Sequence, residues 1–332
     1  MPALQAVIPL PAMLAQSSAS SPMRPDLSIS RARLAMLLGG LAMFGPFSID
    51  TIFPAFRVIA RDLAVSPWMM QQTVSVYLIA YASTSLFHGA LSDAYGRRRV
   101  ILTGLAVFAL ASVGCALSLS ITTLLAFRAL QGLSAGVGLI VGRAVIRDRL
   151  HGDDAQRMMS SVSMIFSIAP AIAPVIGGWL LDGFGWHAVF WFLLLFAATL
   201  WTTTFFALPE THPVAERTPF RPSTLLRTNR AMLGNATFVK LAIAGSLNFN
   251  ALFLYIASAP VFVMELMGLN ERQFGWFFAP TIGGMMLGAF ASGRMAGRIS
   301  GLRMANIGCA ISGAAAAINI AFNCFAPDLH PL

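Results

Sequence analysis

Long apolar stretches separated by short polar connections make up most of this chain. Nine of them are long enough to cross a lipid bilayer, since a spanning helix needs roughly 20 mostly apolar residues. They cover residues 34–56, 68–91, 100–118, 121–142, 158–181, 186–208, 238–264, 273–293 and 304–326. None alternates strictly between apolar and polar residues, as the strands of a membrane barrel do. Because lipid offers the backbone no hydrogen-bond partner, we expect nine transmembrane helices and an all-α polytopic membrane protein.

Composition supports this class. The chain is 57% hydrophobic and 11% charged, whereas soluble domains carry about 25% charged residues. The five histidines and three cysteines show no metal-ligand spacing. The sequence contains no G-x-x-x-x-G-K phosphate-binding loop and no nucleophile paired with a base. We therefore expect no cofactor, no metal ion and no enzymatic activity.

The basic residues predict the orientation. Eighteen of the 22 precede the first stretch or follow the second, fourth, sixth and eighth, three lie in the opposite loops, and Arg128 lies within the fourth. Positive charge collects on the cytoplasmic side of membrane proteins. We expect a multi-pass protein of the inner or plasma membrane with a cytoplasmic N-terminus. This distribution also argues against a nucleic-acid partner, despite the net charge of +9.

One long polar connection divides the chain. Residues 209–236 are basic and proline-rich, with six stretches before them and three after. We expect a cytoplasmic tail over 1–32, a six-helix bundle over 33–208, a cytoplasmic linker over 209–236 and a partial three-helix bundle over 237–332. A degenerate copy of the loop at Gly89, beginning at Gly293, suggests that the two bundles are repeats.

Two opposite charges lie inside predicted helices. Asp50 and Arg128 are each about 9–10 Å below the outer surface at 1.5 Å per residue. A charge in a span is costly and usually faces a partner or a wet cavity. A carboxyl group there can bind and release a proton as its surroundings change. We expect Asp50 and Arg128 to couple transport to protons; the alternative is an ion pair that only fixes packing.

The loop GALSDAYGRRRVIL carries the strongest motif. Gly89 would let two helices approach closely, Asp93 can bond a helix N-terminus or pair with arginine, and Gly96 would turn the chain. Arg97 and Arg98 would face the cytoplasm. We expect this loop to gate the cytoplasmic side; the alternative is an ordinary basic loop.

The fifth stretch contains Pro170, Pro174, Gly177 and Gly178. Proline removes a helix hydrogen bond and bends the helix, and paired glycines permit close packing at the bend. We expect a hinge that favours export, with a merely kinked helix as the alternative.

A substrate pocket is expected from side chains that are apolar and adaptable or are polar within a span. The candidates are Phe47, Met164, Asn248, Asn250 and Tyr255. Methionine packs against many shapes, and polar groups in spans usually face a cavity. Hydrogen bonding between helices is the alternative role for the polar members.

Five segments together resemble the major facilitator superfamily, and most closely its Bcr/CflA drug-resistance subfamily of drug/proton antiporters. They are residues 50–54, 89–99, 128–136, 169–178 and 208–211. The resemblance runs from about residue 33 to 326. It implies a proton-coupled exporter of drugs or small amphipathic compounds that works by alternating access.

The expected helix count departs from this family, which has two six-helix halves. Nine spans correspond to a complete first half and three helices of the second. We therefore expect a C-terminally truncated transporter that is weakly active, and a monomer if full length. Its expected partners are a small-molecule substrate, protons and the lipid bilayer. The alternatives are a transporter of a defined nutrient such as an amino acid, or a membrane protein remnant that does not transport.

Overall fold

The computed structural model describes residues 29–260 and 274–325, and the regular structure of these residues is entirely helical. The elements are α2 (Arg31–Asp50), η2 (Phe53–Ala55), α3 (Phe56–Asp62), α4 (Pro67–Tyr95), α5 (Arg97–Ala116), α6 (Ile121–Arg149), α7 (Gly152–Phe166), α8 (Ala169–Phe184), α9 (His187–Ala207), η3 (Val214–Glu216), α10 (Pro222–Leu233), α11 (Ala236–Pro260), α12 (Phe274–Met295) and α13 (Gly301–Phe325).

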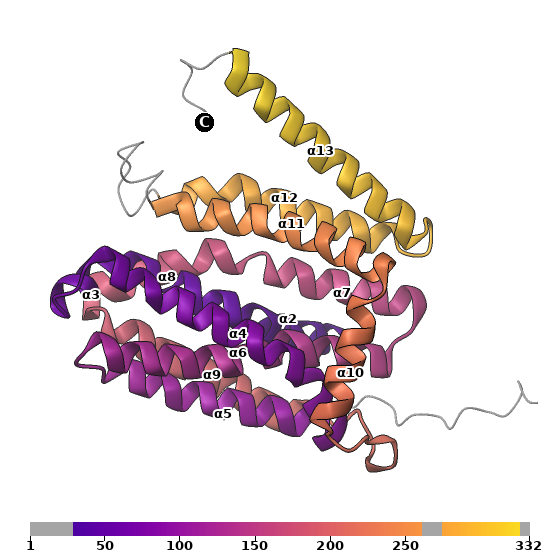
Figure 1. The fold of residues 1–332 in the computed structure, drawn as a ribbon, viewed down its shortest axis with the longest axis horizontal. Coiled ribbons are helices and arrows are strands. Elements are labelled where there is room, and N and C mark those ends of the chain that lie inside the picture. The colour runs from indigo at the N-terminus through magenta and orange to yellow at the C-terminus, as the bar shows by residue number, and fades with distance from the viewer. Residues whose placement is uncertain (1–28, 261–273, 326–332) are drawn as a thin grey trace, which may run out of the picture.

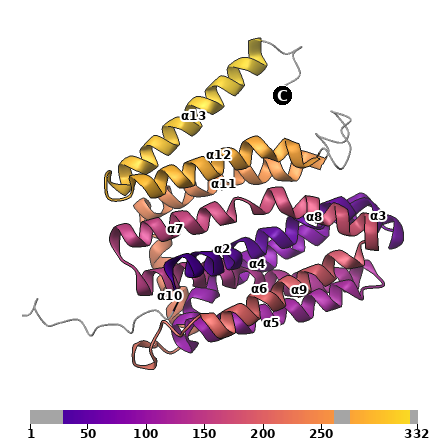
Figure 2. The same ribbon diagram turned by 180° about the vertical axis from the view of Figure 1, so that it is seen from behind.

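The long helices run side by side as a bundle (Figures 1 and 2). Helix α6 packs on α4 and α5, α5 packs on α9, and α2 contacts α6, α7 and α8. From the second part of the chain, α12 packs on α7 and α8. Helix α13 diverges from the bundle, and none of its membrane-length window is buried. The first part of the chain therefore supplies most of the packed core.

Within residues 29–260 and 274–325, six helical segments are long and apolar enough to cross a membrane by length and composition. They are Arg31–Asp62, Pro67–Tyr95, Arg97–Ala116, Ile121–Arg149, His187–Ala207 and Gly301–Phe322. The other three expected stretches fall on α7 with α8, on α11 and on α12. The all-α class is thus confirmed, whereas the count of nine spans stays a prediction.

The first expected span is interrupted. Helix α2 ends at Asp50, a short turn and η2 follow, and α3 continues to Asp62. Pro54 lies in the first turn of η2. Because proline lacks the N–H that a longer helix would need, the chain restarts there. This break places Asp50 at a helix C-terminus.

The fifth expected span is also two helices rather than one kinked helix. Helix α7 ends at Phe166 and α8 begins at Ala169. Pro170 occupies the first turn of α8, where its missing N–H costs nothing. Of these two prolines, only Pro174 lies in the interior of α8. The interruption at residues 167–168 lies directly before Pro170, where a proline ends a preceding helix.

Local signals explain where several helices begin. The Ser66 hydroxyl accepts a hydrogen bond from the Met69 N–H at 3.2 Å, and Pro67 opens α4. Ser120 and Thr123 form a reciprocal capping box at the start of α6. These caps satisfy backbone donors that the helix itself leaves unpaired.

The core is aromatic and the outer surface is apolar. Phe44 of α2 lies between Phe108 of α5 and Phe196 of α9, with ring centroids 4.2 and 5.9 Å away. On the outside, Leu110 and Trp179 are each 70% exposed. Such exposed side chains would be a liability in water, but they suit a bundle surrounded by lipid.

Candidate functional site

Arg128 lies at the centre of the bundle and is fully buried. Its Nη1 donates to Gln131 Oε1 at 2.8 Å and to the Ser48 carbonyl at 3.4 Å, and its Nε donates to the Thr73 carbonyl at 3.4 Å. Gln131 in turn donates to the Ser112 hydroxyl at 2.8 Å. Helices α2, α4, α5 and α6 thus all contribute to one group of polar residues, which we call the Arg128 cluster.

Tyr77 completes the Arg128 cluster. The guanidinium carbon of Arg128 lies 4.4 Å from the centroid of the Tyr77 ring, a cation–π distance. The Tyr77 hydroxyl donates to the Gly45 carbonyl at 3.0 Å and lies 2.8 Å from the Ser48 hydroxyl. Arg128 Nη2 nevertheless has no hydrogen-bond partner among the described residues. A buried donor without a partner is costly, so this nitrogen marks a place where another acceptor could bind.

Asp50 lies two residues beyond Ser48 on α2 and is only 4% exposed. Its carboxyl group makes no hydrogen bond or ion pair within 29–260 or 274–325. Arg128 therefore does not pair with Asp50; its partners are Gln131, two carbonyl oxygens and an aromatic ring. The two charges are connected instead through the backbone of α2 at Ser48.

The hinge segment of α8 packs against the break that follows Asp50. A Cβ at Gly177 would collide with the backbone carbonyl of Thr51, whereas one at Gly178 would meet nothing within 4 Å. Of the two glycines, only Gly177 is needed for this close approach. Pro174, buried and one turn earlier, lies within the same helix. Movement of α8 would therefore reach the backbone beside Asp50 directly.

The loop between α4 and α5 forms a buried ion-pair cluster around Arg97, which is 5% exposed. Arg97 Nη1 donates to Asp93 and, at 2.5 Å, to the Ser92 hydroxyl; its Nε donates to Asp148 Oδ2 at 3.0 Å. Glu210 accepts from the Arg97 backbone N–H at 2.9 Å. We call these five residues the Arg97 cluster.

The expected loop at residues 89–99 is mostly helical, because α4 continues to Tyr95 and only Gly96 separates it from α5, and its two glycines differ sharply. Gly96 has φ of +98°, and a Cβ there would collide with Glu210 and Arg217. A Cβ at Gly89 would meet nothing within 4 Å, so Gly89 does not provide the close helix approach that its motif suggests. Arg98 leaves the Arg97 cluster, since it donates to the Phe205 carbonyl and lies 4.9 Å from the Phe205 ring centroid.

Three of the five expected substrate residues have described side chains, and these three lie apart from one another. Phe47 is 4% exposed and packs on Phe192 and Phe196 of α9. Asn250 of α11 is exposed. The side chains of Asn248 and Tyr255 lie outside what the structure describes.

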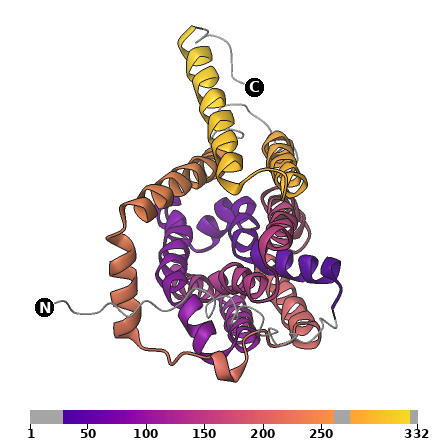
Figure 3. The same ribbon diagram turned by 90° about the vertical axis from the view of Figure 1, so that its right-hand side faces the viewer.

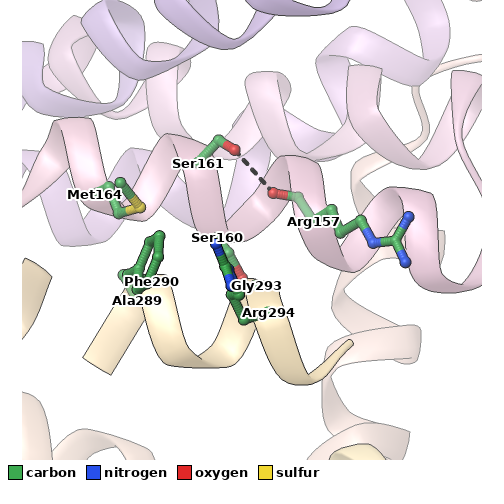
Figure 4. Close-up of a pocket in the computed structure, with 8 residues that line it drawn as sticks. All are labelled: Arg157, Ser160, Ser161, Met164, Ala289, Phe290, Gly293 and Arg294. Carbon is green, nitrogen blue, oxygen red and sulfur yellow. Dashed lines mark hydrogen bonds between the residues drawn. The ribbon is translucent and has the colours of Figure 1, made fainter. Parts of the chain in front are cut away.

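Met164 does line a pocket, of about 450 Å³, between α7 and α12. Figure 4 shows Met164 on α7 facing Phe290 on α12, with Arg157 extending along α7 away from them. Arg294 and Ser160 complete its polar part. The Ser160 and Ser292 hydroxyls lie 3.5 Å apart beside the pocket. The pocket thus lies where the first part of the chain contacts the second part.

Three residues at these sites escaped the sequence-based selection. Tyr77 looks like any aromatic residue in a span, and Asp148 resembles a loop acid. Glu210 belongs to the segment 208–211, whose match to a known motif was the available signal. Their partners are 29 to 113 positions away in sequence, so spacing alone could not have identified them.

Comparisons with known proteins agree with this architecture. Residues 35–325 match the family model of the Major Facilitator Superfamily. The chain is 31% identical over 276 residues to a "Bicyclomycin resistance protein homolog" of Haemophilus influenzae, covering 83% of this chain and 69% of that protein. It is 35% identical over 271 residues to an "Uncharacterized MFS-type transporter YdgK" of Bacillus subtilis, covering 81% and 67%.

Two further similarities point the same way. The chain is 32% identical over 252 residues to the "Multidrug resistance protein MdtL" of Escherichia coli, covering 76% of this chain and 63% of that one. The crystal structure of the human organic anion transporter MFSD10 (TETRAN) superposes with a TM-score of 0.60 at 19% identity, covering 82% and 74%. At this identity the superposition supports the fold alone.

Proposed function

The chain belongs to the major facilitator superfamily, and from that premise we propose that it is a multi-pass transporter that exports drugs or other small amphipathic compounds in exchange for protons. Relatives named for bicyclomycin and multidrug resistance support the substrate class. Their names say nothing of the coupling ion, so the proton is argued from the residues.

The observation that carries the proposal is the environment of Asp50. Its carboxyl group is buried at a helix C-terminus and has no polar partner among the residues described. A charged carboxylate is costly in such a place, because burial removes water and the helix end is already negative. Binding of a proton to the Asp50 carboxylate removes this cost. Release of the proton requires a conformation in which water reaches the carboxyl group. A transporter that alternates between two openings supplies both states in turn.

Three other features fit alternating access. Arg128 holds α2, α4 and α6 together beside Asp50. The α8 segment packs on Thr51 through Gly177, so it is placed to transmit motion to the Asp50 region. Helices α7 and α12 are in contact at Ser160 and Ser292, and this contact would close the space between the first and second parts of the chain at one end of the bundle.

The domain division and orientation complete the proposal. Residues 33–208 form the first bundle, 237–332 belong to the second, and 209–236 link them after a tail of 1–32. The basic loops and the N-terminus face the cytoplasm, as their arginine content predicts. The Arg97 cluster then lies at the cytoplasmic rim and stabilises that side rather than selecting substrate.

The test is the pH dependence of drug binding and flux in the reconstituted chain. Because proton and substrate compete in an antiporter, wild-type protein should bind ethidium less tightly as pH falls. Asp50→Asn should bind with an affinity that does not vary with pH and should lose proton release on binding. Vesicles with an imposed pH gradient then give the flux.

A matched control is Asp182→Asn, which neutralises an exposed acid at the end of α8. It should leave the pH dependence of the wild type unchanged. Unaltered pH dependence in Asp50→Asn would reduce Asp50 to a structural role and overturn the coupling proposal. The binding measurement decides this even where turnover is slow.

A further inference from the structure

Helix α10 in the linker differs from every helix of the bundle in its direction. Figure 1 shows it running across the bundle axis, level with the end at which α4 passes into α5. Viewed along the bundle in Figure 3, it lies outside the ring of long helices. Its position beside the bundle corresponds to the level of the lipid headgroups if the basic loops are cytoplasmic.

One side of α10 is apolar and exposed. Leu226 is 72% exposed, Leu233 69% and Met232 46%. Leu226 and Leu233 are seven positions apart, as are Leu225 and Met232, so the two pairs run along adjacent lines of the helix. Asn229 lies between these lines and is half-buried. The main helix packed against α10 is α11. This apolar side therefore has no packing partner in the described structure that would explain it.

Two arginines lie on the rest of the α10 surface, and neither has an ion-pair partner among the residues that the structure describes. Arg227 and Arg230 are exposed and share a side of the helix, three positions apart. Arg221 precedes the helix and Lys240 follows it, both exposed. From residue 217 to residue 264 the sequence contains no aspartate or glutamate. A local excess of positive charge beside an apolar stripe is the pattern of helices that lie in the plane of anionic membranes.

We propose that α10 is an anionic-lipid-binding helix that lies in the headgroup layer of the inner leaflet. Leu226, Met232 and Leu233 would enter the acyl boundary, and Arg227 and Arg230 would bind lipid phosphates. A protein partner could cover the apolar side of α10 but would also need acidic groups to pair with the arginines. An anionic membrane beside the helix offers both an apolar layer and negative charge. The inference requires only that the chain spans a membrane, and it holds whether or not Asp50 couples transport to protons.

A consequence follows for the linker as a whole. It joins the two parts of the chain, so fixing α10 to the surface would restrict how far these parts can move. Arginine near an anionic surface contributes on the order of a fivefold gain in partition. Loss of both arginines should thus weaken partition of α10 by on the order of 25-fold.

Site-directed fluorescence in vesicles tests the proposal. The full chain, with Cys115, Cys309 and Cys324 replaced, carries an environment-sensitive probe at Leu226→Cys or, on the polar side, at Ala231→Cys. Vesicles are phosphatidylcholine alone or mixed with phosphatidylglycerol, and each also contains a nitroxide-labelled lipid. The probe at 226 should shift to the blue and be quenched by the nitroxide in anionic vesicles. High salt should reverse this, and the probe at 231 should stay accessible to aqueous iodide.

The double variant Arg227→Gln/Arg230→Gln should lose this quenching, whereas the matched double variant Arg99→Gln/Arg303→Gln should keep it. A probe at Leu233→Cys repeats the measurement where position 226 is disruptive. Equal quenching in neutral and anionic vesicles would overturn the anionic requirement. Two results would overturn the lipid contact altogether. One is access of iodide to the probe at position 226 in every lipid. The other is shielding of this probe from both iodide and nitroxide, which would show that protein covers this side of α10.

Discussion

Arg128 places a positive charge inside the bundle, and none of its partners among the described residues is a carboxylate. Its charge is distributed over an amide oxygen, two carbonyl oxygens and the face of Tyr77. These partners are dipoles rather than charges, so the arginine stays available to a developing negative charge nearby. Such an arrangement suits a group that acts on Asp50 or on a substrate more than one that only fixes packing.

Replacement of Arg128 should therefore affect stability and transport differently. Arg128→Ala leaves buried oxygens unpaired, at about 1–3 kcal/mol for each group, and should lower the melting temperature as well as transport. Arg128→Lys keeps the charge but loses the planar fork and the stacking on Tyr77, so it should recover stability more than transport. Thermal unfolding in detergent and flux in vesicles measure the two effects. Arg99→Lys, at an exposed position, is the control; equal loss in both arginine-to-lysine variants would contradict the prediction.

Gly89, inside α4, and Gly96, between α4 and α5, give a second residue-level prediction. Gly96→Ala forces a left-handed conformation that costs an L-residue about 1–2 kcal/mol. It also drives a methyl group into Glu210 and Arg217, so it should disrupt the Arg97 cluster and lower the melting temperature by several degrees. Gly89→Ala meets open space inside α4 and should leave stability unchanged or raise it by up to about 1 kcal/mol, since glycine disfavours a helix interior. Similar melting temperatures for the two variants would show that the cluster does not depend on this turn.

At the scale of elements, two expected spans are interrupted, and the helix that follows the second interruption packs on the first. Helix α2 ends at Asp50, and α8 starts anew after Ile168 and then packs on Thr51. Each break frees backbone groups that a continuous helix would pair, which is tolerated in membranes where protein or a wet cavity surrounds them. We therefore expect shape changes in the bundle to occur at these two breaks.

Adjacent glycines on α8 test this contact. Gly177→Ala should separate α8 from the Thr51 carbonyl, and overpacking of this kind costs about 1–3 kcal/mol. We expect lower stability and a larger loss of flux, because the disturbance lies beside Asp50. Gly178→Ala, one residue away, has free space and should behave like the wild type. Flux and melting temperature measured on both variants give the comparison, and a neutral Gly177→Ala would remove α8 from the mechanism.

At the scale of the whole molecule, α7 and α12 connect the first and second parts. Ser160 and Ser292 lie opposite each other across this contact with their hydroxyls 3.5 Å apart. Gln156 also contacts the sulfur of Met304 at 3.6 Å. If the two parts rock about a central site, this contact must open once in each transport cycle.

A cross-link at this contact should stop the cycle. Ser160→Cys/Ser292→Cys, in a chain without its native cysteines, should form a disulfide on mild oxidation and lose proton-driven flux. Reduction should restore flux, and each single variant should be insensitive to oxidation. Full flux in the oxidised, cross-linked protein would show that α7 and α12 need not separate. A gel-shift assay establishes the extent of cross-linking independently of flux.

The sequence by itself determined the class, the family and the position of the apolar helices. Apolar length and the uneven distribution of arginine are local properties that the bilayer imposes, so they can be read without tertiary contacts. The motif at residues 89–99 and the charges at Asp50 and Arg128 could also be recognised from the sequence, because each depends only on residue types at nearby positions. Orientation, proton coupling and the number of spans remain predictions.

Only the tertiary structure decided which of these residues touch. It separated Arg128 from Asp50, brought Tyr77 and Gln131 to Arg128, and joined Arg97 to Asp148 and Glu210. It also placed Phe47 in the core and Met164 at the α7–α12 pocket. The physical reason is that neighbouring spans are chosen by side-chain shape and close backbone approach, as at Gly177. Periodicity along one helix does not encode which residue of another helix fills the space beside it.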